Sequence, residues 1–296
     1  MLLKFRNPTI NYLNSQLSTI IINLGDKKVI KNKKEILNNL YKVLQKRADF
    51  VVLGLSGGID SAVLACICAK ALKPDNVYAY GMPYNRIDWV KYNYNAEEIA
   101  RNIKINYKTV PIYDVVEGYK DTIDFTLSEK NKGNLISRIR TNVLYTQNTR
   151  LKEMTDKVGL VIGTSNMTEM FIGSHVKGGD ALGDIFPLGD IYKSEVYDFA
   201  NYFSKIKMLN TKMIDYIPTT GLYGEKTTEE LIGYNYEQIE SVINDWTEYV
   251  QKPEEKNITE LYNISEMHKY VLDSYFQNKH KYPYANIIPI RYLIKK

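Results

Sequence analysis

Apolar residues along the chain follow two different spacings. Short runs rich in Val, Ile, Leu and Tyr, of the kind found in buried strands, occupy residues 50–55, 77–82, 107–112 and 159–163. Around these runs the apolar residues recur at helical spacing, over residues 32–47, 62–72, 94–103, 134–154 and 193–203. Strands that alternate with helices predict right-handed crossovers. We therefore expect a doubly wound α/β fold, with a mostly parallel sheet and helices on both faces.

We expect residues 1–296 to form a single domain. The length and the hydrophobic share of 44% suffice for one large core and exclude a disordered or collagen-like chain. An N-terminal segment, 1–32, precedes a core at 33–250, and a charged break at 251–257 introduces a helical C-terminal tail at 251–296.

Charge and cysteine content restrict the partners and the compartment. The net charge is +5, with basic and acidic residues interspersed, so we expect no nucleic-acid partner. The apolar runs are far shorter than the roughly 18 residues of a membrane span, and the N-terminus has no signal-peptide pattern, so we expect no membrane association. The two cysteines, Cys66 and Cys68, lie in an apolar stretch and are typical of core thiols in a cytoplasmic protein.

The clearest candidate site is a glycine-rich octet where the first strand meets a helix. Adjacent glycines let the backbone bring N–H groups near an anion, and the helix N-terminus adds its positive dipole end. The octet lacks the GxxxxGK[ST] pattern of a Walker-type loop. We expect a phosphate-binding loop formed by Gly54, Leu55, Ser56, Gly57, Gly58, Ile59, Asp60 and Ser61. An ordinary strand–helix turn with a capping Ser or Asp is the alternative.

Asp60 adds a carboxylate to this loop. A carboxylate beside phosphates is repulsive unless a divalent cation lies between them, so Asp60 predicts a Mg²⁺ ion. After the fourth strand, Glu169 is a candidate second oxygen ligand and Thr164 can donate to a phosphate. The following Gly- and Pro-rich segment carries further charges, at Lys177, Asp180, Asp184 and Lys193. Each charge alone could be a solvated loop residue, but their grouping favours a site.

The octet resembles the pyrophosphate loop of the ATP pyrophosphatases, which cleave ATP between its α and β phosphates to form an adenylate. The stretch 163–193, which starts Gly-Thr-x-x-x-x-Glu and ends in Lys, narrows the resemblance to the NAD synthetases. Residues 132–140, 217–231 and 280–281 are similar to three further motifs of that family: Gly-Asn-x-x-x-Arg-x-Arg, Pro-[Ser/Thr]-x-x-Leu followed by Asp-Glu-x-x-Leu-Gly, and His-Lys. The resemblance implies the adenine nucleotide alpha hydrolase-like variant of the Rossmann-like fold.

The resemblance also assigns roles residue by residue. It implies that ATP is bound by the octet together with Thr164, Lys193 and Thr219. Asp60 and Glu169 match the Mg²⁺ ligands of the family. Positions that bind deamido-NAD match Arg138, Lys177, Asp184, His280 and Lys281. Asp180 matches an acidic position near the ammonia and acyl-adenylate centre, so Asp180 and Lys193 are the expected catalytic residues.

The implied reaction is ATP-dependent amidation of deamido-NAD (nicotinic acid adenine dinucleotide) with ammonia, giving NAD, AMP and pyrophosphate through an acyl-adenylate. Because the loop-bearing core begins near residue 33, we expect no glutaminase domain and free ammonia as the nitrogen donor. The family also implies a homodimer. Two alternatives stay open: another ATP pyrophosphatase that adenylates a different carboxyl group or a tRNA base, and a non-catalytic nucleotide-binding homologue.

The chain departs from the family just before Asp180. Where the family has aromatic-Thr-Lys-aromatic-Gly-Asp-Gly-Gly, residues 174–181 are Ser-His-Val-Lys-Gly-Gly-Asp-Ala. The resemblance implies that His175 replaces the aromatic residue that stacks on the pyridine ring, or that another residue supplies this contact. The departure bears on the identity of the substrate more than on the fold.

Overall fold

Four parallel strands form the central sheet of the computed structural model, which describes residues 33–86, 90, 93–123, 127–213, 228–251, 258–262 and 264–281. The spatial order is β3-β2-β1-β4. The strands are β1 (Phe50–Gly54), β2 (Val77–Gly81), β3 (Asn106–Thr109) and β4 (Gly159–Ile162). Register pairs such as Val51 with Val77 and Val51 with Leu160 place β1 at the centre of the sheet.

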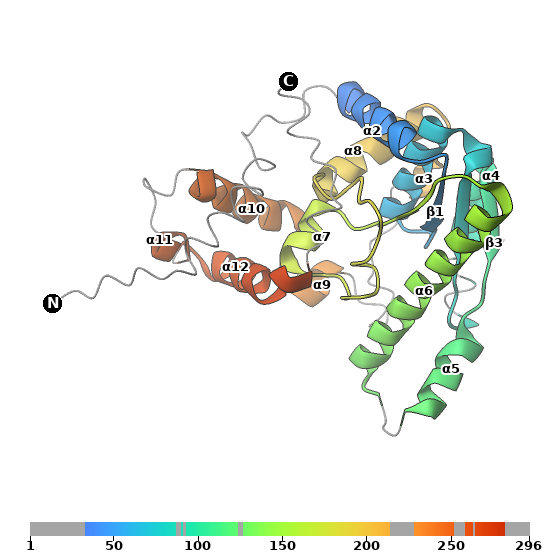
Figure 1. The fold of residues 1–296 in the computed structure, drawn as a ribbon. Coiled ribbons are helices and arrows are strands. Elements are labelled where there is room, and N and C mark those ends of the chain that lie inside the picture. The colour runs from blue at the N-terminus through green and yellow to red at the C-terminus, as the bar shows by residue number, and fades with distance from the viewer. Residues whose placement is uncertain are drawn as a thin grey trace.

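Side chains of β1 alternate between two apolar layers, as the period of a strand requires. Val51 and Leu53 enter the larger cluster, and Phe50 and Val52 enter a second cluster with Leu144. The larger cluster is covered by α2 (Lys33–Arg47), α3 (Ile59–Leu72), α4 (Tyr94–Ile103) and α8 (Lys193–Lys205). The other face is crossed by α6 (Glu129–Thr155), against which α5 (Tyr113–Thr122) packs (Figure 1). This arrangement confirms the expected doubly wound parallel fold.

Three predicted boundaries were wrong by three residues or more. Helix α3 begins at Ile59 and not at residue 62, so the last three residues of the octet are helical. Helix α6 begins at Glu129 and not at residue 134 because the Ser128 hydroxyl caps it by accepting from Asn131 N at 3.3 Å. Strand β3 ends at Thr109, just before Pro111, which has no N–H for the ladder.

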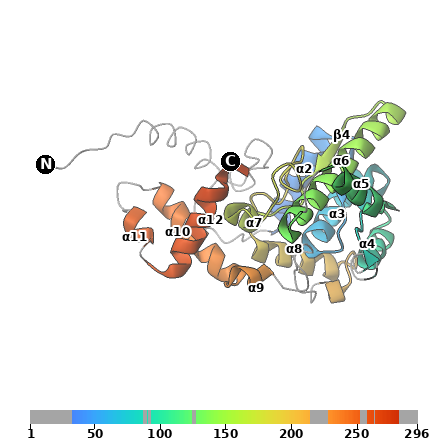
Figure 2. The same ribbon diagram turned by 90° about the horizontal axis from the view of Figure 1, so that it is seen from below.

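A second helical layer lies beside the sheet domain (Figure 2). Its core joins Met167 and Phe171 to Ile239, Trp246 and Leu272. The helices involved are α7 (Met167–Ile172), α9 (Thr228–Ile232), α10 (Tyr236–Gln251), α11 (Ile258–Tyr262) and α12 (Glu266–Asn278). Short 3-10 turns occupy Pro74–Asn76, Thr211–Met213 and Lys279–Lys281.

Some predictions concern residues outside the described part of the chain. The N-terminal segment 1–32, residue Thr219 in 214–227, and the end of the C-terminal tail, 282–296, lie there. Among the helices that the structure describes, none combines the length and the apolar character needed to cross a bilayer.

Candidate active site

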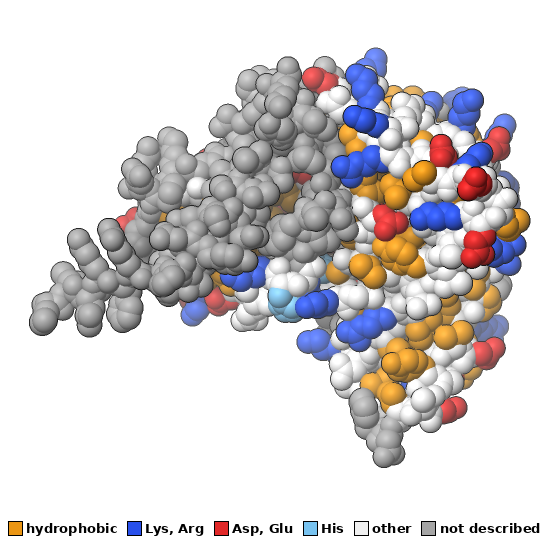
Figure 3. Space-filling model, in the orientation of Figure 1, with side chains coloured by type: hydrophobic (Ala, Val, Ile, Leu, Met, Phe, Trp, Pro, Cys, Tyr) orange, Lys and Arg blue, Asp and Glu red, His pale blue; other side chains and the backbone are white. Residues whose placement is uncertain are grey.

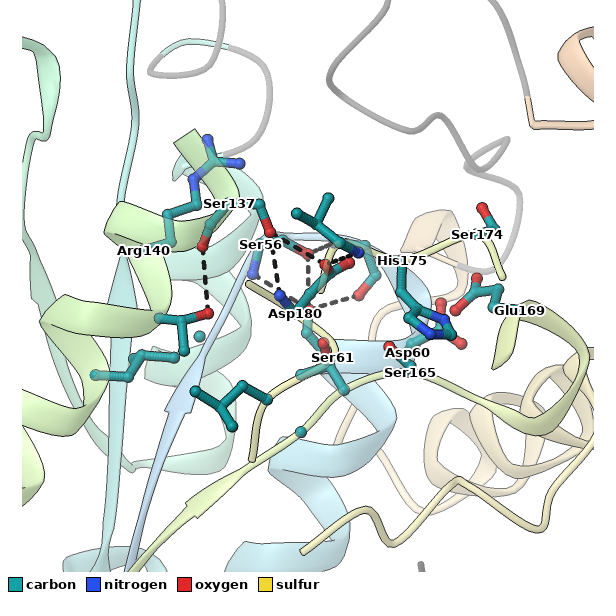
Figure 4. A pocket seen from close by; sticks show the side chains of 18 of the residues that line it. Ser56, Asp60, Ser61, Ser137, Arg140, Ser165, Glu169, Ser174, His175 and Asp180 are labelled. Carbon is teal, nitrogen blue, oxygen red and sulfur yellow. Dashed lines mark hydrogen bonds between the residues drawn. The ribbon is translucent and has the colours of Figure 1, made fainter. Parts of the chain in front are cut away.

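A cavity of about 870 Å³ opens at the carboxyl ends of β1, β2 and β4, the edge where open α/β sheets bind ligands. It brings together most of the residues that the sequence singled out: Gly54, Leu55, Ser56, Gly58, Ile59, Asp60, Ser61, Arg138, Thr164, Glu169, Lys177, Asp180, Lys193, His280 and Lys281. Gly57 and Asp184 do not line it. Asp60, Glu169 and His175 lie at one end, and Ser137 and Arg140 of α6 lie at the other (Figure 4).

The glycine-rich octet forms a tight turn held by its two serines. Ser61 Oγ accepts from Ser56 N at 3.2 Å, lies 3.0 Å from Ser56 Oγ and donates to Gly58 O at 3.0 Å. Gly57 has φ +82°, a conformation that glycine adopts without strain. The turn therefore delivers the N-terminus of α3 to the cavity, with its positive dipole end facing inward.

Lys193 joins the two predicted metal ligands. Its ammonium donates to Asp60 Oδ2 and, at 3.0 Å, to Glu169 Oε1. Asn166 contacts both residues: its side-chain amide donates to Asp60 Oδ1 at 2.8 Å, and its side-chain oxygen accepts from the backbone N–H of Glu169 at 3.0 Å. Residues from three separate segments thus meet in one charged cluster beside the phosphate loop.

The electrostatics of this cluster follow from its burial. Lys193 is only 1% exposed. Burial works against its charge, but the Asp60 and Glu169 carboxylates hold the pKa of Lys193 well above its usual value. Burial raises the pKa of Glu169 to about 7, with Asp60 acting in the same direction and Lys193 opposing it. Two carboxylates share one ammonium here, so the cluster suits a further positive charge.

Asp180 is fixed to helix α6. Its Oδ1 accepts from Ser137 Oγ at 3.1 Å and from Val176 N at 2.7 Å, and its own N–H donates to Ser137 Oγ at 3.1 Å. This approach requires Gly179, where a Cβ would lie 2.3 Å from Ser137 Oγ. Asp180 therefore stands at the cavity wall in a defined orientation, while its side chain stays open to solvent.

Cationic residues also line the cavity, away from the phosphate loop in the sequence. Arg138 Nε donates to Lys177 O at 3.2 Å, and Lys281 Nζ donates to Gly173 O at 3.2 Å. Burial lowers the pKa of Lys281, and the nearby charge of Lys130 adds to that effect. In Figure 3, Lys, Arg and His side chains gather between the end of α12 and the adjoining part of α6. This part of the cavity is suited to an anionic ligand.

Asp184 lies outside the cavity. Its Oδ2 accepts from Val161 N at 2.8 Å, and its Oδ1 accepts from the Tyr145 hydroxyl at 3.1 Å. The carboxylate thus satisfies an N–H group of β4, the edge strand of the sheet. In this structure Asp184 supports the sheet, and its predicted role in binding deamido-NAD stays a prediction.

Lys130, Ser137 and Asn166 are among the cavity or cluster residues that were not predicted from the sequence. His175 was named, but not as a side chain without a partner. Asn166 could have been found, because an Asn three residues before a Glu is a typical helix N-cap pattern, and it does cap α7. His175 is 6% exposed, and neither ring nitrogen has a hydrogen-bond partner among the described residues. No sequence signal marks Lys130 or Ser137.

Comparison with known proteins decides the family. The family model described as NAD synthase matches residues 29–285, most of the chain. The chain belongs to the NAD synthase family. A curated relative, the NH(3)-dependent NAD(+) synthetase of Fusobacterium nucleatum, is 32% identical over 272 residues, which are 90% of this chain and 98% of the relative.

Two solved structures extend the comparison. The NMN synthetase of Francisella tularensis superposes with a TM-score of 0.68 at 26% identity, covering 84% of this chain and 95% of its own. The NH3-dependent NAD synthetase of Campylobacter jejuni, solved with a nitrate ion, gives a TM-score of 0.64 at 26% identity, covering 84% and 96%. The NAD synthase fold thus extends over most of this chain.

Proposed function

We propose that this protein is an ammonia-dependent NAD synthetase, a ligase that amidates deamido-NAD with ammonia at the expense of ATP. The observation that carries the proposal is that one cavity combines two complementary sets of residues. A phosphate loop and the Asp60–Lys193–Glu169 cluster form the first set, and the cationic or basic side chains of Arg138, Lys177, His280 and Lys281 form the second. Such a cavity can hold a nucleoside triphosphate against a second, anionic nucleotide.

In the first step, an oxygen of the nicotinate carboxylate attacks the α phosphorus of ATP, and the bond to pyrophosphate breaks. Negative charge then moves onto the departing pyrophosphate. The N–H groups at the start of α3 and the Lys193 ammonium would stabilise that charge, because they are fixed in place before the reaction begins. The product of this step is an acyl-adenylate, which requires no covalent bond to the protein.

In the second step, the ammonia nitrogen attacks the acyl carbon, the carboxamide forms and AMP leaves. Ammonia is mostly ammonium at neutral pH, so a proton must be lost. The Asp180 carboxylate is placed to orient ammonium and to act as the base that takes up a proton. Its hydrogen bond to Ser137 holds it at the cavity wall. This makes Asp180 and Lys193 the catalytic residues of the proposal.

The two carboxylates fit a Mg²⁺ ion. Mg²⁺ in phosphate sites is held by one or two carboxylates, and phosphates and waters complete its shell. Asp60 and Glu169 supply this pair beside the phosphate loop. Among the residues that the structure describes, no group of three His, Cys, Asp or Glu side chains forms a closed protein cage. When bound, Mg²⁺ would supply positive charge to the phosphates of ATP.

A shorter substrate is the second candidate. The same chemistry applied to nicotinate mononucleotide would give NMN, and the structural match to an NMN synthetase, at a TM-score of 0.68, favours testing it. We place the dinucleotide first because the curated relative that covers 90% of this chain is named for NAD.

The test is a product assay. The full-length protein is incubated with ATP, Mg²⁺ and ammonium chloride, together with deamido-NAD or nicotinate mononucleotide, and the products are identified by mass spectrometry. We expect NAD and AMP from the dinucleotide, only when ammonium is present. NMN formed at a higher kcat/KM than NAD would instead establish the shorter substrate. AMP release without any amide product would refute both candidates.

We further propose that the enzyme works as a homodimer in the cytoplasm. Cys66 and Cys68 are buried free thiols, and burial raises the pKa of both, which suits a reducing compartment. Light scattering of the purified protein would test the dimer, with a mass near twice 34.3 kDa expected.

A further inference from the structure

One face of helix α10 is turned towards the first turn of α8. Tyr236, Glu240 and Asn244 occur at intervals of four residues and therefore lie on the same side of the helix. The Lys193 ammonium lies 5.4 Å from the centre of the Tyr236 ring, and Asn244 Oδ1 accepts from the Tyr192 hydroxyl at 3.0 Å. Glu240 lies between these two contacts.

Glu240 makes three hydrogen bonds although it is only 6% exposed. Its Oε1 accepts from Thr168 Oγ1 at 2.9 Å and from Ser194 N at 3.1 Å, and its Oε2 accepts from Ser194 Oγ at 2.5 Å. Thr168 Oγ1 in turn accepts from Lys193 N at 3.1 Å. A buried carboxylate with three donors around it is well satisfied, and its charge is favourable at a helix N-terminus.

The hydrogen-bond partners of Glu240 are sequence neighbours of residues in the Asp60–Lys193–Glu169 cluster. Thr168 directly precedes Glu169, and Ser194 directly follows Lys193. The first N–H groups of a helix have no partner inside that helix. Here Thr168 satisfies Lys193 N and Glu240 satisfies Ser194 N. Hydrogen bonds to Thr168 and Glu240, in the helical layer, therefore fix the backbone beside Glu169 and Lys193.

We infer that Glu240 is a positioning residue for the amidation: it locks α7 to α8 and so holds Glu169 and Lys193 in the geometry that the reaction needs. The inference rests on the proposed function of this cavity. It makes α10 part of the catalytic apparatus, although Glu240 itself does not line the cavity. A small displacement of a charged group at a reacting phosphate is enough to slow catalysis strongly.

The test compares Glu240→Ala, Glu240→Gln and Thr168→Val with Val271→Ala, a control that removes apolar volume from the same helical layer away from the cluster. Rates of NAD formation are measured at a temperature where every variant is folded. We expect Glu240→Ala to lower kcat about tenfold or more, with a smaller change in the KM for ATP. Glu240→Gln can still accept from Thr168 and should stay within about threefold of the wild type.

Thr168→Val removes the hydrogen bonds of the Thr168 hydroxyl to Glu240 and Lys193 without changing α10. This variant replaces Glu240→Ala in the test if Glu240→Ala does not fold. Because both substitutions break the same chain of hydrogen bonds, the double variant should be no slower than the slower single variant. A kcat for Glu240→Ala within twofold of Val271→Ala would overturn the inference. A Glu240→Gln variant as slow as Glu240→Ala would do so too.

A crystal structure of Glu240→Ala separates this inference from the proposed function. Loss of the contacts from Lys193 Nζ to Asp60 and Glu169 would support positioning even if the wild type made no NAD. An unchanged cluster in that structure would refute positioning even if the wild type were an active NAD synthetase.

Discussion

His175 is a buried imidazole at the wall of the cavity. It is 6% exposed and has no hydrogen-bond partner for either ring nitrogen among the described residues. Burial lowers its pKa, against the opposing charge of Asp180, so the ring is neutral near pH 7. A neutral imidazole offers one donor and one acceptor, and neither is used by the described residues.

Replacing His175 with Leu should stabilise the free protein. The substitution removes two buried nitrogens without partners and keeps a side chain of similar size, so we expect the free energy of unfolding to rise by about 1 kcal/mol. Urea unfolding monitored by circular dichroism measures this change. A fall in stability would show that the imidazole has a partner in the free protein.

The structure brings the predicted site residues together where the sequence pattern was local. The octet apart from Gly57, together with Glu169 and Lys193, lines the cavity, because strand ends and helix starts in a parallel sheet converge on one edge. Asp184 does not, since an unpaired N–H on the edge strand β4 binds its carboxylate. The backbone N–H of Val161 needs an acceptor only because β4 is an edge strand, and the sequence alone does not reveal the strand order.

At the scale of elements, α12 carries His280 and Lys281 towards the cavity, so its start and end matter. It begins at Ser265, whose Oγ accepts from His268 N at 3.3 Å and lies 2.9 Å from His268 Nδ1. The other ring nitrogen of His268 lies 3.0 Å from Asp245 Oδ2 on α10. The cap therefore also ties α12 to α10.

Ser265→Ala should destabilise the protein by about 1 kcal/mol, because it removes the N-cap of α12 and one partner of a buried histidine. Chemical denaturation measures the loss. Ser241→Ala, at an exposed position on α10, is the matched control and should change stability by less than about 0.5 kcal/mol. Equal effects of the two substitutions would contradict the capping role.

The elements of the sheet domain were largely predictable, whereas several helices were not. Buried strands and long amphipathic helices have clear patterns, and α4 and α8 start where the sequence indicated. Helix α5 was missed because it is short and has a single buried residue, Val116. The early turns of α6 contain Gly133, a poor helix former, and packing against α5 overrides that preference.

At the scale of the whole molecule, the end of α7, which borders the cavity, meets α12 at Gly173. This residue ends α7 with φ +71°, and a Cβ there would lie 2.1 Å from Asn278 Cβ of α12. Asn278 Nδ2 donates to Ile172 O at 3.4 Å, and Lys281 Nζ donates to Gly173 O at 3.2 Å. The position of the cationic residues after α12 depends on this close approach.

Gly173→Ala should destabilise the protein by about 2 kcal/mol or more, through its left-handed backbone and the clash with α12. It should also raise the KM for deamido-NAD, because it displaces Lys281. Gly118→Ala is the control, since nothing lies within 4 Å of the added Cβ on α5, and it should stabilise by about 0.5 kcal/mol. An unchanged KM for Gly173→Ala would show that the position of Lys281 does not depend on the close approach of α12 to Gly173.

The central claim is that the phosphate loop and the Asp60–Lys193–Glu169 cluster catalyse formation of NAD. The most direct measurement is the initial rate of NAD formation from deamido-NAD, ATP, Mg²⁺ and ammonium for the wild type, Asp60→Asn and Asp198→Asn. Asp198 pairs with Lys33 at the surface, 2.9 Å away, and serves as the matched control. We predict that Asp60→Asn lowers kcat about 100-fold or more while Asp198→Asn stays within about twofold. A folded Asp60→Asn protein with the wild-type rate would contradict the account.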